Sequence, residues 1–161
     1  MTQYKHIFTP FKIGNVTVKN RIEVAPGGSH LASIDCDVTR ESLEYKRAFA
    51  KGGAGIVTMG HTSVVSQYSL NLGHTYNLGT DKSINVLNRI AEIIQRYGAK
   101  ASIELNYHVS YSPTEMTLDE IKMVIESYAK AAYRCMVAGM DMITVALQKN
   151  FNLCQAPKCK I

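Results

Sequence analysis

The histidines are the first candidates for catalytic residues in this sequence. Four of the five lie outside the segments predicted to be regular, namely His30, His61, His74 and His108. An imidazole titrates near neutral pH and can act as a general acid or base, or activate a Ser or Cys nucleophile. None of the four stands at a spacing from Ser, Asp or Cys that predicts a dyad or triad. Nucleophilic catalysis is therefore the weakest function considered, and a single loop histidine is usually a solvated side chain.

The cysteines form no complete ligand set for a metal ion. Cys36 and Cys135 stand alone, and Cys154 and Cys159 would supply only half of a site. No apolar signal segment begins the sequence, and no run of ~18 apolar residues would cross a membrane. We expect reduced thiols in a cytoplasmic protein without metal or membrane contact.

Length and charge narrow the class of protein further. The 161 residues carry a formal net charge of +5, and 46% of them are hydrophobic. The basic residues are scattered and are not interleaved with aromatics, so nucleic-acid binding is not predicted. The chain is long enough for one domain with a core. It is too short for a complete eight-fold barrel, which needs ~250 residues.

The chain is organised around residues 51–63, with the sequence KGGAGIVTMGHTS. Gly52 and Gly53 can adopt the conformations that end a helix, and Ile56–Met59 is an apolar run too short for a helix. Gly60 begins a long polar loop that reaches about Asp81. A helix, a glycine turn, a buried strand and a loop in this order are typical of parallel β/α proteins, where functional residues collect at the C-terminal ends of the strands.

The same alternation along the chain predicts an α/β fold: a partial TIM barrel of about four β/α units with parallel strands, preceded by an N-terminal β-hairpin. We expect this half barrel over residues 1–146 and an irregular tail over residues 147–161. The expected elements are a hairpin of Phe11–Ile13 and Val16–Val18, strands at Arg21–Ala25, Gly55–Met59, Lys100–Leu105 and Met142–Val145, and helices capped by Thr39, Ser83 and Thr117 that end near Lys51, Tyr97 and Gly139.

Two of the predicted helices carry apolar residues at helical spacing, which indicates a buried stripe on each. In the first helix the stripe is Leu87, Ile90, Ala91 and Ile94. The second follows a Thr-x-x-Glu capping box at Thr117 and Glu120. Its stripe is Ile121, Val124, Ile125, Tyr128, Ala132 and Cys135.

Alternation within the predicted strands separates an apolar face from a polar one. An ordinary doubly covered sheet would be apolar on both faces, so the polar face fits the lumen and mouth of a barrel that holds a ligand. The alternative is an open sheet with one wet face. The apolar set, expected to meet the helices, is Ile22, Val24, Val57, Met59, Ile103, Leu105, Ile143 and Val145. The polar set is Glu23, Ala25, Thr58, Gly60, Ser102, Glu104, Asn106, Thr144 and Ala146.

Three stretches together resemble the old yellow enzyme family (NADH:flavin oxidoreductase / NADH oxidase): FTPFKIGNVTVKNRIEVAP, GGAGIVTMG and RYGAKASIELN. The branch they resemble contains the 2-enoate reductases and bile-acid-inducible flavoproteins. The resemblance covers residues 8–141 and only the N-terminal half of the family's barrel. It implies a TIM barrel that binds FMN at its C-terminal mouth and passes hydride from NAD(P)H through the flavin to an activated alkene or another acceptor.

The resemblance assigns cofactor contacts to the ends of the first two strands. Ala25, Pro26 and Gly27 match the segment that lies along the isoalloxazine ring, where backbone groups can hydrogen-bond the flavin and Gly27 permits close approach. Gly60 matches the small residue beside the flavin pyrimidine, and His61 is its neighbour.

Glu104 stands where the family commonly has a Gln that bonds the flavin pyrimidine. A carboxylate still accepts a hydrogen bond from a flavin N–H but cannot donate one as an amide does. Its negative charge would also disfavour an anionic reduced flavin. The alternative interpretation of Glu104 is a strand carboxylate directed toward the surface.

The sequence departs from the family pattern in its later part. The family continues after Asn106 with His-Ala-Gly, whereas here Tyr107 follows and Pro113 comes soon after. The family's substrate-anchoring histidine pair aligns with Ala146 and Lys149, so no catalytic residue is assigned. The later strands and the flavin phosphate site lie beyond the matched part, and the family's iron–sulfur cysteines have no counterpart.

Two functions from different classes follow. The first is an FMN-binding, NAD(P)H-dependent oxidoreductase acting on a small molecule, with ene reduction weakened by the missing half and the missing histidine pair. The alternative is a non-catalytic half-barrel remnant or assembly module. Its open sheet edges predict a homo-oligomer or pairing with another polypeptide.

Overall fold

The structure is a computed structural model that describes residues 4–67, 73–107 and 115–146. Its main sheet has four strands in the order β3-β4-β7-β8, all parallel. The strands are β3 (Glu23–Val24), β4 (Ile56–Met59), β7 (Lys100–Leu105) and β8 (Met142–Val145). The predicted parallel α/β order is therefore confirmed, although the first strand is shorter than the expected Arg21–Ala25.

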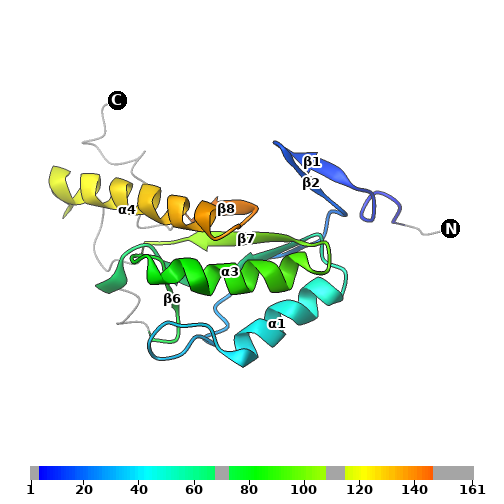
Figure 1. The fold of residues 1–161 in the computed structure, drawn as a ribbon. Helices are drawn as coiled ribbons and strands as arrows, with labels where there is room; N and C mark the ends of the chain where they lie inside the picture. The colour runs from blue at the N-terminus through cyan, green and yellow to red at the C-terminus, as the bar shows by residue number, and fades with distance from the viewer. Residues whose placement is uncertain (1–3, 68–72, 108–114, 147–161) are drawn as a thin grey trace.

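Within the described ranges three helices accompany the sheet, and Figure 1 shows α3 lying between α1 and α4. They are α1 (Arg40–Lys51), α3 (Lys82–Gln95) and α4 (Leu118–Val137). The predicted hairpin is also present as β1 (Phe11–Ile13) and β2 (Val16–Val18), paired antiparallel around Gly14 at φ 56°. It lies at the opposite end of the molecule from β6 (Figure 1).

Helix starts follow the predicted capping chemistry in two of three cases. The Thr39 hydroxyl accepts from the Ser42 N–H, and Thr117 and Glu120 form a reciprocal capping box. The prediction for α3 was wrong, because Asp81 is its N-cap and the Ser83 hydroxyl donates to the carbonyl of Thr80 at 2.8 Å. That helix also ends at Gln95, two residues before the expected Tyr97.

The long loop after β4 holds a small parallel pair that sequence reasoning missed. It consists of β5 (Thr62–Ser63) and β6 (Tyr76–Asn77). Two-residue strands carry no readable alternation, so periodicity could not find them. β5 continues alongside β7, because the Val64 N–H donates to the carbonyl of Asn106 at 2.9 Å.

The core lies between the helices and the apolar face of the sheet. Val57, Met59 and Ile103 are fully buried, and every residue of the predicted α3 stripe is buried as well. Each such side chain contributes about 1.5–3 kcal/mol when fully buried. The apolar-face prediction is therefore confirmed for the two central strands.

Four residues expected in the core are instead exposed: Ile22 by 37%, Ile125 by 59%, Ile143 by 44% and Val145 by 51%. Ile22 precedes the short first strand. The other three lie on β8 and on α4, where no described helix packs beyond α4. The periodicity identified the face on which these residues lie, but a side chain is buried only if another helix or strand packs against that face.

The polar face of the sheet is not wet at its centre. Thr58 is 0% and Ser102 is 2% exposed, and the Thr58 hydroxyl donates to the Glu23 carboxylate at 2.5 Å. Small, satisfied polar side chains fit the closely packed inside of a curved wall. The alternative of an open sheet with one wet face is therefore wrong for these central positions.

Asp141 fixes the point at which β8 begins. Its carboxylate accepts from the Lys100 ammonium, the Ala101 N–H and the Gln95 amide, each at 2.9 Å. Burial alone would raise the pKa of Asp141, but these hydrogen bonds outweigh it and lower the pKa. One carboxylate therefore joins β7, the end of α3 and the start of β8.

Lys46 is a fully buried cation on the inner face of α1. Its side chain is 2% exposed, and among the described residues no carboxylate pairs with it. The ammonium lies 5.3 Å from the ring centroid of Tyr45, a contact that offsets only part of the desolvation cost. Burial lowers the pKa of Lys46 to about 8.

The Lys46→Met variant should be more stable than the parent at neutral pH. The fall in pKa from 10.5 to about 8 corresponds to on the order of 3 kcal/mol. This cost is full below pH 8 and disappears above the unfolded value, so the parent's free energy of unfolding should rise with pH in that window relative to that of the variant. Urea unfolding at both ends of the window measures this. Lys51→Met, at the exposed end of α1, is the control and should keep the rise.

Candidate functional site

The C-terminal ends of three neighbouring strands meet at Gly60. Gly28, from the turn after β3, pairs with Gly60 in an isolated parallel bridge. A Cβ added to Gly60 would lie 3.0 Å from the Cβ of Pro26, 3.1 Å from Oε2 of Glu104 and 3.2 Å from the backbone N of Gly27. The structure therefore brings together four of the six residues predicted to contact a cofactor.

The two remaining predicted residues lie beside this cluster. His61 follows Gly60 directly and is half-buried, and its Cβ is 3.7 Å from a Cβ added to Gly28. Ala25 directly follows β3 and is exposed. His30 joins the group, with its ring centroid 6.1 Å from that of His61.

The other predicted histidines do not join the site. His74 is exposed, and its Nδ1 lies 2.7 Å from the carbonyl oxygen of Ala32. His108 lies outside the described residues. The histidines therefore separate into a pair at the strand ends and one that contacts a loop.

Glu104 presents a carboxyl group to Gly60 from the end of β7. Its side chain is half-buried, and burial raises its pKa above the usual value. The backbone carbonyl of Glu104 accepts a hydrogen bond from the Thr62 hydroxyl, which ties the strand to β5. The surface-directed alternative for this residue is wrong, because the carboxyl points into the cluster. When protonated it can donate a hydrogen bond as an amide does.

Two further polar groups lie near the same edge of the sheet. Asn106 is 3% exposed, and its Oδ1 has no hydrogen-bond partner in the structure. The Tyr128 hydroxyl lies 3.5 Å from the carbonyl oxygen of Ala146. Burial raises the pKa of Tyr128 to about 12, the charge of Glu104 adds to this and a hydrogen bond to the Tyr107 backbone opposes it.

Sequence reasoning found one of these two groups only as part of a pattern. Strand alternation placed Asn106 in the polar set, whereas Tyr128 was assigned to the packing stripe of its helix. A buried amide oxygen without a partner is uncommon and is an acceptor available to a ligand or a water molecule.

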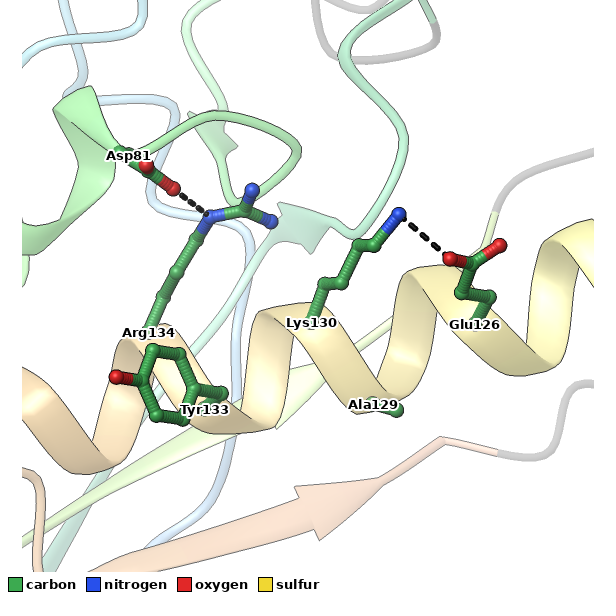
Figure 2. Close-up of a pocket in the computed structure, with 6 residues that line it drawn as sticks. All are labelled: Asp81, Glu126, Ala129, Lys130, Tyr133 and Arg134. Atoms are coloured by element: carbon green, nitrogen blue, oxygen red, sulfur yellow. Dashed lines mark hydrogen bonds and ion pairs between the residues drawn. The ribbon is translucent and has the colours of Figure 1, made fainter.

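A separate hollow of about 300 Å³ lies between α4 and Asp81 at the start of α3 (Figure 2). It shares no residue with the Gly60 cluster. Both of its cations are already paired, Arg134 with Asp81 and Lys130 with Glu126, each at 2.7 Å. The hollow therefore offers no free charge to an ionic ligand.

No metal centre or membrane element is found in the described part of the chain. Within those residues no three His, Cys, Asp or Glu side chains gather to hold an ion. Cys36 and Cys135 are buried free thiols, and Cys154 and Cys159 lie outside the described residues. None of the described helices has the length and apolar character needed to cross a membrane.

Parallel β/α units whose strand ends form a closely packed, glycine-lined cluster define the class as one wall of a TIM barrel with its functional mouth. Residues 6–115 match the NADH:flavin oxidoreductase / NADH oxidase family. The chain belongs to this family, as the sequence resemblance predicted.

Curated relatives support the same assignment. The chain is 26% identical over 167 residues to an NADH oxidase of Thermoanaerobacter brockii, a match that covers 89% of this chain and 26% of that protein. It is 27% identical over 165 residues to an NADPH dehydrogenase of Listeria monocytogenes, covering 86% of this chain and 47% of that protein. The chain thus spans between about a quarter and a half of these relatives.

Solved structures confirm the fold. The structure resembles that of a variant of NCR from Zymomonas mobilis with a TM-score of 0.76 and 26% identity, over 86% of this chain and 44% of that one. It resembles Old Yellow Enzyme from Pichia sp. AKU4542 with a TM-score of 0.78 and 21% identity, over 87% and 45% of the two chains. These neighbours are TIM barrels, so the predicted partial barrel is confirmed and covers under half of the full one.

Gly60→Ala should destabilise the protein by about 1–3 kcal/mol, because the new methyl group would overpack against Pro26, Gly27 and Glu104. Gly27→Ala is the matched control, since nothing lies within 4 Å of a Cβ added there. It should change the free energy of unfolding by less than about 0.5 kcal/mol. Denaturant unfolding of both variants measures the difference, and equal losses would contradict the described convergence at Gly60.

Proposed function

We propose that the chain binds FMN at the Gly60 cluster and acts as an NAD(P)H-dependent oxidoreductase of the old yellow enzyme type. Its substrate would be a small activated alkene or another acceptor. The observation that carries this proposal is the convergence of Pro26, Gly27, Gly60 and Glu104. A bound flavin would supply the hydride-accepting and hydride-donating centre. Membership of the flavin oxidoreductase family supports the choice of cofactor.

The residues present fit a flat heteroaromatic ring. Gly27 and Gly28 are exposed and carry no side chain, so a ring can approach their backbone closely. Glu104 supplies a carboxyl group beside Gly60, and Asn106, near the same edge of the sheet, has a buried amide oxygen without a partner. Both are acceptors suited to ring N–H groups. We assign His61 and Ala25 to the edge of the same site.

Nothing in the described residues polarises a substrate carbonyl in the manner of the family's histidine pair. Ala146 occupies the first aligned position, and Lys149 lies outside the described residues. The Tyr128 hydroxyl lies 3.5 Å from the carbonyl oxygen of Ala146, and its raised pKa keeps it protonated at neutral pH.

The alternative proposal is an assembly module without its own catalysis. The observation that favours it is the exposure of Ile143 and Val145 on the edge strand β8. Both proposals hold together if association completes the barrel. We also propose a cytoplasmic location, in keeping with the two unpaired, buried thiols.

We expect riboflavin and FMN to bind this chain with affinities within about threefold of each other. The described strands form the ring-binding wall, whereas the phosphate site of such barrels lies after the seventh and eighth strands. Quenching of flavin fluorescence on titration measures both affinities, with lumichrome, which keeps the ring system but lacks the ribityl chain, as a third probe. Absence of binding by all three would refute the proposed function, and a preference of tenfold or more for FMN would refute the ring-only assignment.

Glu104→Gln should raise the reduction potential of bound flavin at alkaline pH. The parent's carboxylate opposes an anionic reduced ring, and the amide removes that charge. A rise on the order of 30 mV corresponds to a tenfold change in the affinity ratio of reduced and oxidised flavin. The difference should fade as pH falls, at a higher pH than for an ordinary Glu, because burial raises the pKa of Glu104.

A spectroelectrochemical titration at several pH values measures this effect. Glu44→Gln, on the exposed face of α1, is the control and should leave the potential unchanged. A shift of equal size in both variants would show that Glu104 does not face the ring.

A further inference from the structure

The two histidines of the Gly60 cluster lie side by side over a glycine. A Cβ added to Gly28 would lie 3.1 Å from Nε2 of His30 and 3.7 Å from Cβ of His61. The centroids of the two imidazole rings are 6.1 Å apart, and the ring planes are tilted by 56°. His30 follows β3 and His61 follows β4. The parallel bridge between Gly28 and Gly60 therefore brings together two side chains that are distant in sequence.

The backbone of His30 is in the left-handed region, with φ 50°. This conformation is uncommon for residues other than glycine, although His adopts it more readily than most. His74 shares it, with φ 51°, but Nδ1 of His74 lies 2.7 Å from the carbonyl oxygen of Ala32. Within the described residues no such hydrogen bond holds the ring of His30. A strained residue here presents an imidazole whose nitrogens are available to a ligand.

The surroundings of His30 suit a small ligand with a hydrogen-bond acceptor. His30 and Gly28 are exposed, whereas His61 is half-buried. One ring can therefore be reached from solvent, and the other is held in the protein beside it. A neutral imidazole donates one hydrogen bond, and its Nε2 lies over backbone that carries no side chain. A ligand oxygen can approach that nitrogen without displacing a protein atom.

We propose that His30 binds the carbonyl oxygen of an α,β-unsaturated carbonyl acceptor through a hydrogen bond from Nε2, and that His61 positions the ring of His30. The inference rests on the proposed function, because the acceptor must lie beside a flavin at the Gly60 cluster. It places the donor at the end of β3, and not at the position of a histidine pair after β8.

The hydrogen bond would act on the electron distribution of the acceptor. Withdrawal of electron density toward the carbonyl oxygen makes the β-carbon of the conjugated alkene a better acceptor of hydride. His30 neither gains nor loses a proton in this role, so no covalent bond forms or breaks at the imidazole. His61 acts only through His30 and is a positioning residue.

Two substitutions of His30 separate hydrogen bonding from shape. Asn and Asp have nearly the same shape and both tolerate a positive φ, but only Asn can donate a hydrogen bond. The FMN-loaded protein is reduced anaerobically with stoichiometric dithionite and mixed with cyclohex-2-enone or with dioxygen, which has no carbonyl group. The readout is the ratio of the two reoxidation rates. His30→Asp should lower this ratio by about tenfold or more, and His30→Asn by less than about threefold.

A matched control and a second pair of variants complete the series. His74→Asp makes the same exchange at another exposed residue with a positive φ, and it should leave the ratio within about twofold of the parent's. His61→Phe keeps a ring beside His30, so it should lower the ratio by less than His61→Ala, which removes the ring.

A binding measurement gives a readout that does not depend on turnover. Cyclohexanone has the carbonyl group but no alkene, so it can bind without being reduced. In FMN-loaded protein labelled with ¹⁵N-histidine, cyclohexanone should shift the Nε2 resonance of His30 and leave that of His74 in place.

The outcomes distinguish this inference from the proposed function. If the parent binds no flavin, the proposed function fails and this inference fails with it. If flavin binds but cyclohex-2-enone does not reoxidise it, or if His30→Asp and His30→Asn give the same ratio, only the assignment of His30 is overturned. A cyclohexanone shift that is absent from His30 has the same meaning. Equal ratios for His61→Ala and the parent would overturn the positioning role of His61.

Discussion

The site depends on one close approach of backbones. At Gly60 the turn after β3, the end of β4 and the carboxyl of Glu104 come so near one another that a methyl group would contact all three at 3.0–3.2 Å. A residue with no side chain is the condition for this convergence. Parallel pairing then does the rest, since it delivers the C-terminal ends of the strands to one edge of the sheet. Chemical groups far apart in sequence therefore meet at the points where the strands end.

The two faces of the sheet have different roles, one in stabilising the fold and the other in forming the candidate site. The helix-side face supplies the apolar burial that stabilises the unit. The opposite face carries small polar side chains such as Thr58 and Ser102, which are buried. Glu104 stands at the boundary between that packed layer and the mouth. Its raised pKa has the same origin as the core, namely removal of a side chain from water.

Local patterns predicted most of this fold, and their failures share a cause. The α3 stripe from Leu87 to Ile94 was predictable because that helix has neighbours on both sides. Ile125 and Ile143 have the same apolar character and periodicity, but burial depends on an element the pattern does not contain. The site residues at Gly60 and Glu104 came from resemblance, because a single glycine or carboxylate has no periodicity. Strand alternation placed Asn106 in the polar set, but its unpaired oxygen and the position of the Tyr128 hydroxyl depend on three-dimensional packing.

The three-donor anchor at Asp141 has a consequence for association. Lys100, Gln95 and Ala101 donate hydrogen bonds to Asp141, the residue immediately before β8. The edge strand is therefore already extended and in register with β7 before any other strand pairs with it. A strand that must be ordered on docking loses conformational entropy of about 1–2 kcal/mol per residue. Here that loss occurs when the chain itself folds. A strand that pairs with the open edge of β8 therefore meets backbone that is already extended, and this ordered backbone favours one register.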